Sequence, residues 1–120
     1  MILLSFVTIL GILWHGVSGQ VPIPSRPPGY TYANGHADAF IQLDMFIDLL
    51  CPDSKAAYPA LKQVAAKLLP SQFRLRFHQF PLPYHRNAFP VAQASRTITH
   101  ALGDHTFTLW METIYANQDM

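Results

Sequence analysis

The chain has 120 residues, half of them hydrophobic, and its 8 basic and 7 acidic side chains leave a formal net charge of +1. Arg and Lys are scattered, so the sequence lacks the basic stripe that binding to nucleic acid or to an anionic membrane requires. We therefore expect no nucleic-acid partner. The length is sufficient for one modest domain with a single hydrophobic core.

An apolar run from Ile2 to Trp14 opens the chain, and small and polar residues follow it up to Gly19. The run is shorter than the roughly 20 apolar residues that span a bilayer, and Val17 and Gly19 suit a cleavage site. The sequence therefore predicts a signal peptide at residues 1–19 and a protein that is secreted or held in the lumen of the endoplasmic reticulum, with no membrane association after cleavage. An uncleaved anchor is the alternative, and the start of the chain lacks the Lys or Arg that signal peptides usually carry.

Residues 20–39 contain four prolines and two glycines. This composition disfavours both helix and sheet and favours extended or turn conformations. We therefore expect an extended leader here, followed by one domain at residues 40–120.

Residues 41–49 alternate with the period of a strand, and residues 73–80 do so again. The first run places Ile41, Leu43, Met45, Ile47 and Leu49 on one face and Gln42, Asp44 and Asp48 on the other. Between the two runs, the apolar period from Pro52 is that of an amphipathic helix, which Pro70 ends. A strand–helix–strand unit of this kind predicts a parallel pair, and ligands gather at the carboxyl ends of such strands.

Two further helical patterns follow, one from about Ala88 to Ala101 that Gly103 ends, and one that opens at Asp104 as a plausible N-cap. The last helix has a large apolar face, formed by Phe107, Trp110, Met111, Ile114 and Tyr115. The sequence offers no third strand, and two strands alone would be marginally stable. Either these aromatic side chains fold back onto the sheet, or the sequence is a truncated product of a longer protein.

Cys51 is the single cysteine of the chain and stands where the strand pattern gives way to the helix pattern. Unpaired N–H groups in the first turn of a helix stabilise a thiolate, which is the nucleophilic form of cysteine. Lys55 and the Ser54 hydroxyl act in the same direction, whereas the carboxylate of Asp53 opposes a second negative charge. We therefore predict a moderately activated thiol at Cys51, with a buried and inert cysteine as the alternative.

Two segments carry a family likeness: F-x-D-x-x-C-P-x-S at residues 46–54 and F-H-Q-F-P-L-P-Y-H-R-N-A at residues 77–88. The chain resembles the DsbA-like branch of the thioredoxin superfamily over residues 40–120, in particular its small secreted relatives. The resemblance implies an α/β, partial thioredoxin-like fold in which the cysteine starts the first long helix and a helical insert follows the next strand. It also implies Cys51 and Ser54 as catalytic residues, with Pro52, Asp53 and His85 near the substrate.

The chain departs from that family in two ways. Ser54 stands where the second cysteine of a C-x-x-C motif would be, and the later strand with its cis-proline loop is missing. Without a partner cysteine, an attack on a substrate disulfide stops at a mixed disulfide until an external thiol resolves it. In kappa-class glutathione transferases, a serine at a similar place holds the glutathione thiolate, which is an alternative role for Ser54.

Two hypotheses of function follow, and a third possibility is that the chain has no stable fold. The first is a monothiol thiol–disulfide oxidoreductase that acts through Cys51 on protein thiols or disulfides, with glutathione as a further partner and no cofactor. The second is a non-enzymatic binding module or inactive truncated isoform whose exposed apolar surface favours self-association. The histidines show no spacing with Cys or carboxylates that is typical of a metal site, so we expect no metal.

Overall fold

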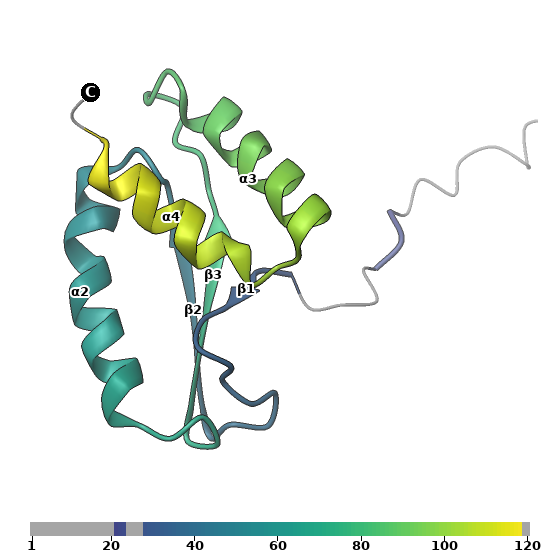
Figure 1. Cartoon of the computed structure of the whole chain (residues 1–120), viewed down its shortest axis with the longest axis vertical. Coiled ribbons are helices and arrows are strands. Elements are labelled where there is room, and N and C mark those ends of the chain that lie inside the picture. Colours follow the sequence, from purple (N-terminus) through teal and green to yellow (C-terminus); the bar gives the residue numbers. More distant parts are fainter. Residues whose placement is uncertain (1–20, 24–27, 119–120) are drawn as a thin grey trace, which may run out of the picture.

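The computed structural model describes residues 21–23 and 28–118; the predicted signal peptide, its cleavage position and Met120 lie outside them. The elements in chain order are β1 (Tyr30–Thr31), β2 (Ile41–Ile47), α2 (Pro52–Lys67), β3 (Phe73–Gln79), α3 (Ala88–Leu102) and α4 (Thr106–Ala116). The predicted α/β class is therefore confirmed, with a strand–helix–strand unit followed by helices (Figure 1). Within this part of the chain, no helix has the length and apolar character that crossing a bilayer requires.

The three strands form one sheet in the order β1-β3-β2. Strand β2 runs parallel to β3, with Met45 opposite Phe77, and α2 forms the crossover between them. The parallel pair predicted from the two alternating runs is confirmed. Because β2 and β3 run in the same direction, both carboxyl ends lie at the same edge of the sheet, which is where α2 begins.

The expectation that the leader contains no strand is wrong at Tyr30–Thr31, which pairs antiparallel with β3. The reason is that Tyr30 is a buried anchor for distant helices. Its ring stacks on Phe107 of α4 at 4.0 Å between centroids, and its hydroxyl lies 3.3 Å from Thr99 Oγ1 of α3. These contacts hold the segment against the sheet, although the surrounding prolines and glycines disfavour regular structure.

The hydrophobic core lies between the sheet and the helices α2 and α4 (Figure 1). The predicted inward residues Phe73, Leu75 and Phe77 of β3 are buried, and Tyr58 of α2 packs against Phe77. From α4, the core receives Phe107, Met111 and Tyr115. Of the two alternatives for the last helix, the structure shows the one in which its apolar face folds back onto the sheet.

Helix α3 ends before Gly103, as predicted, and Gly103 adopts a positive φ of 97° that disfavours other residues. The prediction that Asp104 caps the last helix is wrong, because the N-cap is His105. Asp104 instead belongs to a tight turn, in which its carbonyl accepts a hydrogen bond from the Phe107 amide at 3.1 Å. The turn begins at Gly103, whose carbonyl accepts from both the amide and the hydroxyl of Thr106.

Candidate functional site

Strand β2 ends two residues earlier than the alternating run at residues 41–49 predicts. The strand ends at Ile47, and Asp48, which was predicted to lie on the polar face, is only 3 % exposed. The Asp48 carboxylate accepts a hydrogen bond from the Leu50 amide at 2.8 Å, an Asx-type turn that ends the strand. This turn brings the chain from β2 to Cys51 and the first turn of α2.

Cys51 is the N-cap of α2, as predicted. Its carbonyl accepts the first helical hydrogen bond from the Lys55 amide at 3.1 Å, and its backbone is extended, with φ −81° and ψ 122°. The side chain makes no capping hydrogen bond, so the thiol is not engaged by the helix's own amides. Cys51 is 9 % exposed, so the sulfur lies at the boundary of the core and not on an open surface.

The other predicted site residues of the first turn take different positions. Pro52 and Asp53 are exposed, whereas Ser54 is partly buried. The Ser54 hydroxyl oxygen accepts a hydrogen bond from the Asp48 amide at 3.4 Å. Ser54 therefore helps to close the turn between β2 and α2, at the position that would hold a second cysteine.

His85 joins this turn through Asp48. Its Nδ1 lies 2.6 Å from Asp48 Oδ2, and the Leu82 amide donates to the same oxygen at 2.9 Å. Because a carboxylate only accepts hydrogen bonds, Nδ1 is the donor and Nε2 remains for another partner. The structure therefore brings the predicted substrate-binding residue His85 to the turn that carries Cys51. The link is Asp48, which the alternation predicts on the polar face of the strand.

The end of α4 covers the same turn. The hydroxyl of Tyr115 is buried and has no hydrogen-bond partner among the described residues. Burial raises the pKa of the Tyr115 phenol, and the charges of Cys51 and then Asp48 raise it further. The side-chain amide of Gln118 donates to the carbonyls of Leu49 at 2.8 Å and Cys51 at 3.3 Å.

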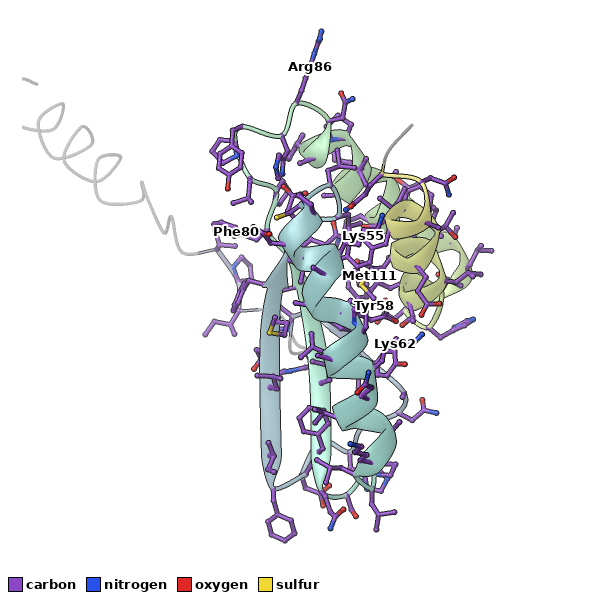
Figure 2. The ribbon with its side chains drawn as sticks, turned by 90° about the vertical axis from the view of Figure 1, so that its left-hand side faces the viewer. Lys55, Tyr58, Lys62, Phe80, Arg86 and Met111 are labelled. Atoms are coloured by element: carbon purple, nitrogen blue, oxygen red, sulfur yellow. The ribbon has the colours of Figure 1, made fainter. Side chains whose placement is uncertain are left out.

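A second contact holds α4 against α2 and so fixes Tyr115 in place. The Tyr58 hydroxyl and the Lys62 ammonium both donate to Glu112 Oε1 at 2.7 Å. Lys62 first and Tyr58 second lower the pKa of Glu112, while burial and then Glu112 raise the pKa of Tyr58. Figure 2 shows Tyr58 and Lys62 along α2, facing the side on which Met111 of α4 lies.

Sequence reasoning missed three members of this site. Asp48 is the D of the F-x-D-x-x-C segment and stands three residues before Cys51, and this spacing is the sequence signal that could have placed it in the site. Tyr115 was assigned only to the apolar face of its helix, and its hydroxyl was the overlooked feature. Nothing in the sequence pattern marks Gln118 as a site residue, because its contacts with Leu49 and Cys51 depend on where α4 ends in the folded chain.

The site as a whole offers a nucleophile at a helix N-terminus, a histidine oriented by a buried aspartate and a buried phenol without a partner. Among the described residues, no group of three or more His, Cys, Asp or Glu side chains is arranged to hold a metal ion. Comparisons of the chain with protein-family models, with curated proteins and with solved structures each gave no match. The resemblance to the DsbA-like branch therefore remains a prediction from the two sequence segments.

Proposed function

We propose that this chain is a thioredoxin-like protein that performs monothiol thiol–disulfide exchange through Cys51. The observation that carries the proposal is the position of Cys51. It caps α2 at the carboxyl end of β2, in the turn that the buried Asp48 holds together with His85 and that Gln118 contacts from the end of α4. A helix N-terminus favours the thiolate, and polar groups around the sulfur are typical of cysteines that react.

In the proposed reaction, the Cys51 thiolate attacks one sulfur of a substrate disulfide. A new disulfide forms between Cys51 and the substrate, the substrate disulfide breaks, and the other sulfur leaves as a thiolate that takes up a proton. Because Cys51 is the single cysteine, an external thiol such as glutathione must attack the mixed disulfide and release Cys51. Within this scheme, Ser54 maintains the turn and His85 lies where the substrate would approach.

Tyr115 and His85 have distinct expected roles. An unpaired buried hydroxyl is unfavourable, so a sulfur anion or a substrate atom beside Tyr115 would gain a hydrogen-bond donor that is already in place. His85 is the partly exposed member of the His85–Asp48 pair, and its Nε2 can give a proton to a leaving thiolate when the ring is in the imidazolium form, with both nitrogens protonated. Removal of either group is expected to lower the rate of exchange.

The proposal is tested by the rate of Cys51 alkylation with iodoacetamide as a function of pH. The single thiol makes the assignment unambiguous, a Cys51→Ser variant gives the background, and the chain in urea gives the unfolded reference. We expect the folded protein to reach half of its plateau rate at a lower pH than the unfolded chain. Normalising each profile to its plateau separates activation of the thiol from its partial burial.

A second measurement follows mixed-disulfide formation with oxidised glutathione by mass spectrometry. The folded protein should form a single adduct that reduced glutathione removes, and His85→Ala should slow both steps. An alkylation profile identical to that of the unfolded chain, or no adduct until the chain is unfolded, would rule out exchange chemistry at Cys51.

We keep one alternative, a binding module without enzymatic activity, because several large apolar side chains are well exposed. Phe40 is 92 % exposed, and Phe46, Phe80, Phe89 and Leu109 are each more than half exposed. Exposed apolar groups that cluster are typical of binding surfaces. Retained ligand binding in Cys51→Ser, together with an unreactive thiol in the native protein, would favour this alternative.

A further inference from the structure

A pocket with a volume of about 540 Å³ lies between β1, the carboxyl end of β3 and α3. Its volume falls in the range of about 300–1,000 Å³ that is common for sites of small organic molecules. Cys51, Asp48 and His85 are not among its lining residues, so the pocket is separate from the thiol site. It therefore needs its own functional explanation.

The walls of the pocket include three phenylalanine rings, from Phe46 of β2, Phe80 after β3 and Phe89 of α3. These rings are 66 %, 58 % and 62 % exposed, and none of them contributes to the buried core. Figure 2 shows Phe80 on the side of the strands away from Met111 and the core. Large apolar rings that converge on a concave surface gain free energy when a ligand removes them from water.

The first of these rings is held in position before any ligand arrives. Phe46 stacks on the ring of His78 at 4.8 Å between centroids, and His78 Nε2 lies 2.7 Å from Asp44 Oδ1. Asp44 is held in turn by the Arg76 guanidinium at 2.7 Å. A wall that is already ordered loses little conformational entropy when it binds a ligand.

The charge of the pocket is positive and comes from Arg96 of α3. Within the described part of the chain, the Arg96 guanidinium makes no ion pair and no side-chain hydrogen bond. None of the described lining residues is acidic, and the one other basic group, His78, is already paired with Asp44. An unpaired guanidinium beside an apolar wall is suited to a carboxylate, which it binds through two parallel hydrogen bonds.

We propose that this pocket binds a small organic acid, with its aromatic or short alkyl body against Phe46, Phe80 and Phe89 and its carboxylate on Arg96. The proposal does not depend on the reactivity of Cys51. A single ligand of this kind accounts for both the exposed phenylalanine rings and the unpaired guanidinium of Arg96.

The test compares 4-phenylbutyrate with 4-phenyl-1-butanol, two probes that share an apolar body and differ in the carboxylate. Binding is followed by the amide signals of the purified chain in two-dimensional NMR spectra. The acid should shift signals of Phe89, Ala92 and Gln93 and bind about tenfold more tightly than the alcohol, as expected for a charge-assisted pair. Cys51→Ser should bind both probes as the native chain does.

Two variants separate the two halves of the site. Arg96→Gln should reduce affinity for the acid to that for the alcohol, while affinity for the alcohol stays the same. Phe89→Ala should reduce the affinity for the acid and for the alcohol by a similar factor. The matched control is Arg86→Gln, which removes an exposed arginine that projects away from the body of the protein (Figure 2) and should leave both affinities unchanged.

Because Arg96, Phe89 and Arg86 are exposed, these changes should leave the fold intact, and the dispersion of the amide signals verifies this for each variant. Equal affinity of the native protein for acid and alcohol would overturn the assignment of the carboxylate to Arg96. Shifts that fall outside the pocket, or no shift with either probe, would overturn the site itself.

Discussion

The protein contains two aspartate–histidine pairs, Asp44–His78 and Asp48–His85, that differ in how deeply the aspartate is buried. Asp44 and His78 are 2.7 Å apart on the outer face of the sheet, where the Asp44 side chain is 33 % exposed. Asp48 and His85 are 2.6 Å apart at the end of β2, where the Asp48 side chain is 1 % exposed. The distances are nearly equal, so burial is the variable that distinguishes them.

The two aspartates also differ in what they hold. Asp44 bonds Arg76 and His78, which come from the neighbouring strand and are already placed by the sheet register. Asp48 bonds two backbone amides and a histidine from a loop with no regular structure. The Asp48–His85 pair therefore determines the conformation of a loop next to Cys51. The Asp44–His78 pair only adds a contact between β2 and β3, which pair through their backbones without it.

The largest difference should appear when each aspartate is removed. Asp48→Ala removes a buried carboxylate and leaves the partly buried amides of Leu50 and Leu82 without their acceptor, so the free energy of unfolding should fall by about 2–4 kcal/mol. Asp44→Ala is the matched change on the surface and should cost about 0.5–1 kcal/mol. Urea unfolding of both variants measures this, and equal losses would show that burial is not what distinguishes the pairs.

A smaller difference is expected in the coupling within each pair. Double-mutant cycles that combine the alanine variants of Asp48 and His85 should give a coupling free energy of about 1–2 kcal/mol. The cycle for Asp44 and His78 should give about 0.5 kcal/mol or less, because solvent screens the pair. A stronger coupling on the surface than in the buried turn would contradict the comparison.

The dependence on pH should distinguish Asp44 in a further way. Hydrogen bonds from Arg76 first and His78 second hold the pKa of Asp44 below its usual range. Because the folded pKa is lowered, the stability from Asp44 is fully present above its unfolded pKa of about 3.9 and is lost as pH falls through the folded value. We expect less than about 1 kcal/mol from this group, since its side chain is partly exposed.

Carbon-detected NMR titration of the Asp44 carboxyl group measures that pKa directly. In Arg76→Gln, the pKa should move back toward the usual range, because the guanidinium is the first cause of the shift. A titration that Arg76→Gln leaves unchanged would show that this hydrogen bond is not its cause.

The smallest effect should come from Phe46→Ala, which removes the ring stacked on His78. Since Phe46 is 66 % exposed, the free energy of unfolding should fall by only about 0.5 kcal/mol. Thermal unfolding monitored by circular dichroism measures it, with Phe40→Ala as a control, a still more exposed phenylalanine next to the same strand. A loss as large as that of Asp48→Ala would mean that the outer face contributes to the core.

The local patterns of the sequence determined the elements of the fold. The alternation of apolar and polar residues at 41–45 and 73–78 specified β2 and β3, because successive side chains of a strand point to opposite faces. The change of period at Pro52, which suits the first turn of a helix, placed Cys51 at the N-cap of α2. These features depend on residues close together in the chain, so they could be predicted without the tertiary structure.

The tertiary structure alone decided the strand β1 and the membership of the site. Tyr30 meets Thr99 across 69 positions of the chain, and Asp48 meets His85 across 37. Asp48 was assigned to the polar face because alternation treats every carboxylate as solvent-facing, whereas two backbone amides and a histidine stabilise it in the interior. Hydrogen bonds between distant residues leave no periodic pattern in the sequence, so only the folded chain shows which groups surround Cys51.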